Sequence, residues 1–138
     1  PYAEAKDGIQ QALASDDPIQ RYWGLVTCST FSGKAASFTD QAKALAASDP
    51  DLLVRARAAE FLAIIRAQDP QSVLLDVLSK SESMMETTQV LNIITLLRDG
   101  EWGYTFDLHP DKIRTRGYFV DRCLVYLCGI QLPPKRSN

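Results

Sequence analysis

The chain has 138 residues, 46% of them hydrophobic, with a formal net charge of −2 and an isoelectric point near 5.3. This length suffices for one domain with a core, because a chain of roughly 150 residues buries about two-thirds of its unfolded surface. The excess of acidic over basic residues argues against nucleic acid as a partner. No apolar run approaches the roughly 20 residues that span a bilayer, so we do not expect a membrane as a partner either. Positive charge gathers only toward the end of the chain, at Arg114, Arg116, Arg122, Lys135 and Arg136.

Three Asp-Pro pairs each precede a run of apolar residues at helical spacing: Asp17-Pro18, Asp49-Pro50 and Asp69-Pro70. An Asp side chain accepts hydrogen bonds from the unpaired N–H groups of a helix's first turn. A following Pro gives up only an N–H that has no partner there. We therefore interpret the three pairs as helix starts.

The chain is also predicted to be a repeat protein, because segments 13–23 and 47–59 align through Arg21 and Arg55 with a period of about 34 residues. A degenerate third copy follows about 32 residues later, and residues 83–86 form its capping box. Each copy is expected to fold as one hairpin of two helices. The predicted repeats and their helices are 2–33 (helices 2–15 and 17–29), 34–67 (39–47 and 49–67) and 68–99 (69–79 and 83–98).

The last part of the chain follows another pattern. Gly100 is expected to end the sixth helix in a left-handed conformation, and residues 100–116 lack a helical period, which predicts an ordered loop. A closing helix over 117–129 and a frayed tail over 130–138 complete the chain. No segment reads as a sheet, so the predicted fold class is all-α. We expect a single domain over 1–138, a right-handed α–α superhelix (a HEAT-like solenoid) of about three hairpins plus a C-terminal helix.

Trp23 and Phe61 hold similar places in the second helices of successive hairpins, and both are predicted to be buried. A ligand groove lined by Trp23 is the alternative. Cys28, Cys123 and Cys128 lie in apolar helical patterns and are expected to be free thiols. A disulfide from Cys28 to one of the other two remains open in an oxidising compartment.

Candidate binding residues crowd into the predicted loop: Trp102, Tyr104, His109, Arg114 and Arg116. Aromatic and Arg side chains often anchor interfaces, because they offer large area and directed hydrogen bonds. The loop is therefore either a docking site or a cap whose rings fold over the apolar edge of the third hairpin. His109 stands beside Asp107 and Asp111, which allows a metal or acid–base cluster, although a turn capped by polar side chains explains it equally well.

Two phrases carry a resemblance to known families. Residues 14–24 and 48–62, the second with Asp-Pro, Val-Arg and Ala-Ala features, resemble HEAT-like repeats, and this likeness covers about residues 3–99. More narrowly, the chain is similar to the helical C-terminal extension of bacterial arylsulfatases and N-sulfoglucosamine sulfohydrolases. That likeness rests on the phrase DDPIQRYWG within 14–24, on the repeat order, and on the closing helix with Arg122 and Tyr126-Leu127.

The resemblance implies that catalysis lies outside this chain. Sulfatases of that family carry a Cys or Ser two residues before a Pro and four before an Arg, which becomes formylglycine, and an Asp/Asn cluster that holds calcium. Cys28 has Thr30 and Ser32 at those offsets, and neither Cys123 nor Cys128 fits better. Formylglycine and calcium would belong to a separate catalytic domain, so we predict no catalytic residue, cofactor or metal in this chain.

These observations favour a non-catalytic accessory domain that packs on a sulfatase-like hydrolase or orients a polymeric substrate toward it. Its partner would be the catalytic domain of the same parent chain, and the resemblance implies a periplasmic or secreted parent. A stand-alone HEAT-repeat scaffold that binds another protein is the alternative, and an enzyme that uses residues 101–116 is a third. The chain begins with Pro1 rather than Met, so we expect a fragment or a processed form.

Overall fold

The computed structural model describes residues 1–132, which form seven α-helices and two short 3₁₀ helices. The prediction of an all-helical chain is confirmed, since none of residues 1–132 forms a strand. Residues 133–138, most of the predicted tail, lie outside the described residues. The helices are α1 (Tyr2–Leu13), α2 (Pro18–Phe31), η1 (Ser32–Phe38), α3 (Thr39–Ser48), α4 (Leu52–Ile64), α5 (Gln71–Lys80), α6 (Met84–Asp99), η2 (Pro110–Lys112) and α7 (Tyr118–Cys128).

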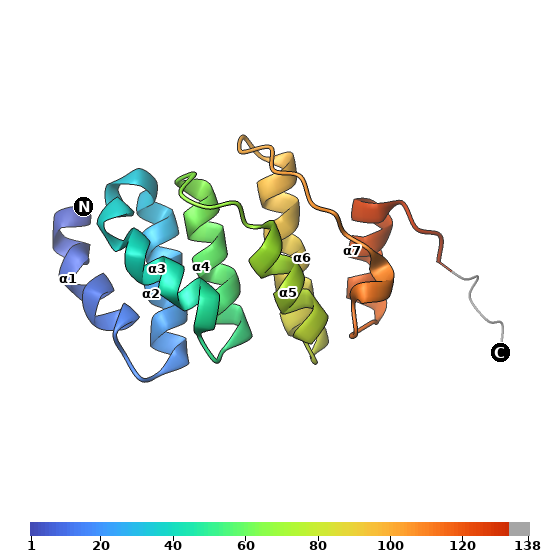
Figure 1. The fold of residues 1–138 in the computed structure, drawn as a ribbon, viewed down its shortest axis with the longest axis horizontal. Helices are drawn as coiled ribbons and strands as arrows, with labels where there is room; N and C mark the ends of the chain where they lie inside the picture. Colours follow the sequence, from blue (N-terminus) through green and yellow to red (C-terminus); the bar gives the residue numbers. More distant parts are fainter. Residues whose placement is uncertain (133–138) are drawn as a thin grey trace.

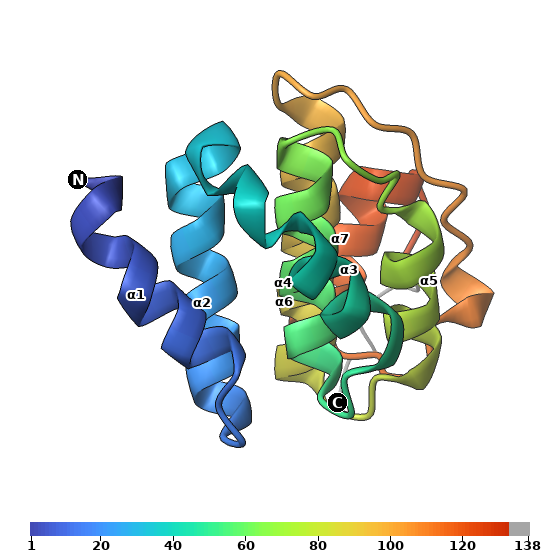
Figure 2. The ribbon, with the colours of Figure 1, turned by 60° about the vertical axis from the view of Figure 1, so that its left-hand side comes forward.

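The helices follow one another along the long axis of the molecule, with α1 and α7 at opposite ends (Figure 1). Three hairpins pair α1 with α2, α3 with α4 and α5 with α6. The second helices of these hairpins also pack on one another in turn, α2 on α4 and α4 on α6, and α7 continues the row on α6. Figure 2 views part of this row nearly end on, with α4, α6 and α7 one behind another.

The second helices keep a regular register. Their N-cap residues are Asp17, Asp51, Ser83 and Gly117, at intervals of 34, 32 and 34 residues. The first three cap side chains accept hydrogen bonds from first-turn N–H groups, which fixes where each helix begins. The intervals agree with the expected period of about 34 residues. Helix α7 is therefore more than a closing helix, because it occupies the place of a fourth second helix.

One expected helix start is wrong. Asp49 ends α3 as its C-cap, and α4 begins after a different N-cap, Asp51. The Asp51 N–H donates to Asp49 Oδ1 at 2.9 Å. Asp49 therefore stabilises the turn between α3 and α4, and the side chain of Asp51 caps α4. Asp17 caps α2 as predicted, and Asp69 accepts the N–H of Gln71, the first residue of α5, at 2.9 Å.

Trp23 is 59% exposed, so the prediction that it is buried is wrong, whereas Phe61 is fully buried as predicted. The two rings do not share a repeat position, because counting from the N-caps aligns Trp23 with Arg57. The next residue, Gly24, takes the buried position in α2, where a Cβ would lie 3.0 Å from the Ala12 Cβ. Trp23 therefore stands at the surface, where it borders a shallow hollow between α1 and α2.

Helix α4 lies at the centre of the core and is buried on both sides. One side joins the cluster of α1 to α3 through residues that include Phe61 and Leu62. The other side presents three alanines, Ala56, Ala59 and Ala63, to the cluster formed with α5, α6 and α7. Because their side chains are small, the neighbouring helices approach closely there.

Arginines four residues after the N-caps pin successive hairpins together. Arg21 donates to both carboxylate oxygens of the buried Asp49, at 2.7 and 3.1 Å, and to the Ser15 carbonyl at 3.0 Å. Its hydrogen bond with Asp49 raises the pKa of Arg21. Arg55 likewise donates to the Ala46 carbonyl at 2.9 Å and to Asp76 at 2.8 Å. Arg21 thus links the turn after α1 to the end of α3, and Arg55 links α3 to α5.

Replacing Phe61 with Ala should lower the free energy of unfolding by about 3–5 kcal/mol, because it removes a fully buried ring from the core. Replacing Trp23 with Ala is the matched control. It should change the free energy of unfolding by less than about 0.5 kcal/mol, because the side chain is exposed. Urea denaturation followed by circular dichroism measures both. Equal losses for the two variants would contradict the observed difference in burial.

Replacing Arg21 with Met should cost about 3 kcal/mol, because Asp49 is left charged and buried. The double variant Arg21→Met/Asp49→Asn should recover part of this loss, since Asn keeps the acceptor for the turn without the charge. Denaturant melts of both variants test this, with the exposed Arg122→Met as control. An undiminished stability of Arg21→Met would show that the pair acts only as a surface pair.

Candidate functional site

Residues 101–117, here called the strap, are extended and pack one face onto the protein. Trp102, Tyr104, Phe106 and Leu108 alternate with exposed residues and lie against the core cluster of α4 to α7. This period of two is that of an extended chain with one covered face. The strap leaves the end of α6 and passes beside α5 on its way to α7 (Figures 1 and 2). It takes the place of a first helix before α7.

Two aromatic residues of the strap, Trp102 and Tyr104, cap the C-terminus of α4. Trp102 Nε1 donates to the Ile64 carbonyl at 3.2 Å, and Tyr104 Oη donates to the Ala63 carbonyl at 2.7 Å. The last four carbonyls of a helix lack intrahelical partners, and the Trp102 bond supplies one for Ile64. The Ala63 carbonyl accepts the Arg66 N–H at 3.0 Å in addition to the Tyr104 hydroxyl. The Arg66 guanidinium lies 5.7 Å from the centre of the Tyr104 ring. Both rings are half-buried and fasten the strap to the end of α4, in the second hairpin rather than the third.

Gly100 ends α6 as expected, but its backbone is extended rather than left-handed, with φ −77° and ψ −170°. The need for glycine has another cause. A Cβ at this position would lie 2.6 Å from the Leu96 carbonyl oxygen and 3.1 Å from the Trp102 ring. Gly100 therefore makes room for the ring that caps α4.

The other three candidate residues of the strap are exposed and contact different elements. His109 Nε2 lies 2.9 Å from Asp107 Oδ1 within the strap. Arg114 lies 3.8 Å from Glu82, and Arg116 Nε donates to Asp121 of α7 at 2.6 Å. The five predicted residues thus divide into two capping rings and three separate surface groups, and the structure does not gather them into one cluster.

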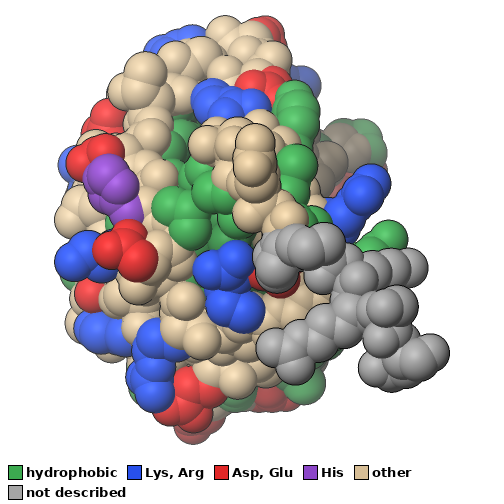
Figure 3. Space-filling view, turned by 90° about the vertical axis from the view of Figure 1, so that its right-hand side faces the viewer, with side chains coloured by type: hydrophobic (Ala, Val, Ile, Leu, Met, Phe, Trp, Pro, Cys, Tyr) green, Lys and Arg blue, Asp and Glu red, His purple; other side chains and the backbone are tan. Residues whose placement is uncertain are grey.

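Seen from the α7 end, hydrophobic side chains gather near the centre of the face, and the single histidine lies at its rim beside acidic side chains (Figure 3). Within residues 1–132, no group of three or more His, Cys, Asp and Glu side chains is placed to hold a metal ion. In the same part of the chain, no helix is both long and apolar enough to cross a bilayer.

The three cysteines are free thiols. Cys28 is fully buried, and burial raises its pKa to about 11. Burial also raises the pKa of Cys123 and of Cys128. A thiol acts as a nucleophile through its thiolate, so this environment suits packing rather than chemistry.

A second surface, which the sequence interpretation missed, lies on the second helices. The residue two positions after each N-cap is apolar in all four: Ile19, Leu53, Met85 and Phe119. We call these residues the apolar row. Ile19 is 64% exposed, Met85 66% and Phe119 59%, whereas Leu53 is half-buried. The only signal in the sequence is the shared distance from the caps, which requires that all four caps be known.

Two shallow hollows accompany the apolar row. One, of about 290 Å³, is lined by Ile19, Tyr22, Trp23, Leu53 and Gln89 among others. The other, of about 340 Å³, is lined by Met84, Met85, Thr88, Gln89 and Phe119. Gln89 borders both hollows, so the row is a continuous surface across the second helices.

A polar network holds the centre of this surface. Tyr22 Oη donates to Gln89 Oε1 at 3.1 Å and accepts a hydrogen bond of 3.1 Å from Arg57 Nε. Arg57 also pairs with Glu60 at 3.0 Å, and its guanidinium stands 5.2 Å from the centre of the Tyr22 ring. Burial alone would lower the pKa of Arg57, but the interactions with Glu60 and Tyr22 outweigh burial and raise this pKa. The network fixes side chains of α2, α4 and α6 relative to one another.

Comparisons of the chain with protein-family models, with curated proteins and with solved structures give no match.

Replacing Tyr104 with Phe should lower the free energy of unfolding by about 1 kcal/mol, because one hydrogen bond to the Ala63 carbonyl is lost while the ring stays. Amide hydrogen exchange should become faster in the strap and at the end of α4. The exposed Tyr118→Phe is the matched control and should change neither quantity. Unchanged exchange in Tyr104→Phe would mean that the hydroxyl does not fasten the strap.

Proposed function

We propose that this chain is a non-catalytic, HEAT-like helical-repeat module, a right-handed α–α superhelix, that binds a protein along its second helices. The apolar row is the observation that carries this proposal. Single exposed hydrophobic residues are ordinary on protein surfaces. Three exposed side chains and the half-buried Leu53 share one repeat position on α2, α4, α6 and α7, and isolated exposure does not explain this order.

The composition of the row and its surroundings favours protein binding. Aromatic, Met and Arg side chains are enriched at the centres of interfaces, and the face combines Trp23, Met85 and Phe119 with the fixed guanidinium of Arg57. Packed helices lie roughly 8–10 Å apart, so a row across four helices extends over about 25–30 Å. A helix of about 20 residues has this length. The surface therefore suits a helix or an extended edge of a folded partner.

The resemblance supports a particular partner. The phrase at 14–24 and the repeat order are similar to the C-terminal extension of bacterial sulfatases, so we propose that the row docks on the catalytic domain of a sulfatase-like parent. Formylglycine and calcium would belong to that domain, and the parent would be periplasmic or secreted. A stand-alone scaffold that binds another protein through the same row is the alternative.

The experiment measures binding of this chain to the separately produced catalytic domain of its parent by calorimetry. The double variant Met85→Asp/Phe119→Asp should weaken binding by at least about tenfold, because it places charges in the desolvated centre of the interface. Both residues are exposed, so thermal stability should be unchanged.

Ala47→Asp adds the same kind of charge to an exposed position of α3 and should leave the affinity unchanged. Equal affinity of the double variant and the unaltered chain would refute docking through the apolar row. Binding of an unrelated protein with the same sensitivity to the double variant, and none of the catalytic domain, would favour the scaffold.

A further inference from the structure

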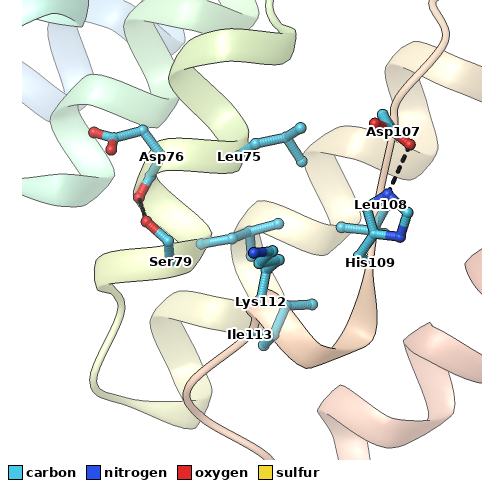
Figure 4. A pocket seen from close by; sticks show the side chains of 9 residues that line it. Leu75, Asp76, Ser79, Asp107, Leu108, His109, Lys112 and Ile113 are labelled. Atoms are coloured by element: carbon cyan, nitrogen blue, oxygen red, sulfur yellow. Dashed lines mark hydrogen bonds and ion pairs between the residues drawn. The ribbon is translucent and has the colours of Figure 1, made fainter.

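A pocket of about 270 Å³ lies between α5 and the strap (Figure 4). Its apolar walls come from Leu75 and Leu78 of α5 and from Leu108 and Ile113 on the other side. The remaining lining residues are Asp76, Ser79, Asp107, His109 and Lys112. The volume is at the lower end of the roughly 300–1,000 Å³ usual for ligand sites, so it suits a small molecule.

The pocket exists because the strap changes course after Leu108. The 3₁₀ turn η2 follows, and Ile113 after it is buried in the core. Two hydrogen bonds hold the wall just before the turn. The Asp107 N–H donates to Gln71 Oε1, and the Cys128 thiol donates to the Leu108 carbonyl at 3.6 Å. These bonds fasten residues 107 and 108 to α5 and to the end of α7.

The charged groups at the rim are not equivalent. Asp76 is engaged by Arg55 at 2.8 Å and Lys80 at 3.0 Å, and these hydrogen bonds lower the pKa of Asp76. Asp107 is engaged by His109 at 2.9 Å. Lys112 has no carboxylate within ion-pair distance among residues 1–132. Figure 4 shows it between the α5 side chains and His109, so the one rim cation without a counter-ion stands over the apolar walls.

We propose that this pocket binds a small amphipathic carboxylate, with its apolar body against Leu75, Leu78 and Leu108 and its carboxylate on Lys112. An apolar cavity with a single unpaired cation at its mouth complements a molecule of this kind in both shape and charge. The inference rests on other residues than the apolar row and stands independently of the proposed function.

Binding is favoured over catalysis by the same geometry. Ser79, the hydroxyl in the lining, donates to the Asp76 carbonyl at 2.7 Å rather than to His109. A nucleophile must lie within hydrogen-bond reach of its base, and no such pair is formed in this pocket by residues 1–132.

Octanoate is the probe, and two molecules with the same chain length, octan-1-ol and octylammonium, are its comparisons. Amide shifts of the ¹⁵N-labelled chain follow each titration. We expect saturable shifts at residues 75–79 and 107–113 with octanoate, and at least about fivefold weaker binding of the neutral and cationic compounds.

Two variants test the assignment. Lys112→Met removes the charge and keeps the length of the side chain, so it should weaken octanoate binding roughly five- to tenfold and leave octan-1-ol unaffected. Ser79→Trp places a ring at the mouth from an exposed position and should abolish binding of both. Lys43→Met, at an exposed position of α3, is the matched control and should leave octanoate binding unchanged.

Equal affinity for the three probes, shifts elsewhere in the chain, or full octanoate binding by Ser79→Trp would each overturn the proposal. Spectra of each variant without ligand show whether it is folded, so a loss of binding by misfolding is recognised directly.

Discussion

The enclosure of α4 on both sides is the constraint on which the rest of the structure depends. Its aromatic side meets the first hairpin and its alanine side meets α5 and α6. A helix enclosed in this way cannot give its terminal carbonyls freely to water, and unpaired buried backbone groups are costly. Trp102 and Tyr104 supply side-chain donors to the last two carbonyls of α4 from 38 and 41 residues away in sequence. The strap is thereby fixed to the centre of the fold.

The strap has consequences because it is not a helix. An extended segment covers less of its neighbours than a first helix does, so the pocket beside α5 stays open and α7 is covered on one side only. The position eight residues after the N-cap faces the following hairpin in α4, and no hairpin follows α7 within residues 1–132. It is buried in α2, α4 and α6 as Leu25, Ala59 and Leu91, but in α7 it is Val125, which is 38% exposed. Apolar side chains therefore remain visible at the α7 end of the molecule (Figure 3).

The two candidate surfaces have different chemistry because different elements build them. The apolar row consists of side chains that stand out from a regular array of helices, and its hollows are shallow. The pocket beside α5 is enclosed by an irregular segment, with one cation over apolar walls. A flat, repeated surface suits a macromolecule, and a small enclosed one suits a small molecule. Of the strap residues chosen from the sequence, only His109 lines the pocket, and none borders the hollows of the apolar row.

The sequence by itself determined the helices and most of their starts, because capping depends on neighbours within three or four residues, as in Ser83 with the Glu86 N–H. It also contained the alternation of Trp102, Tyr104, Phe106 and Leu108, but alternation does not say what covers the apolar face. Only the tertiary structure decided that Trp23 faces solvent while Phe61 is buried, and that the strap rings cap α4. These outcomes depend on which elements approach one another, and close approach is set by contacts between residues far apart in the chain.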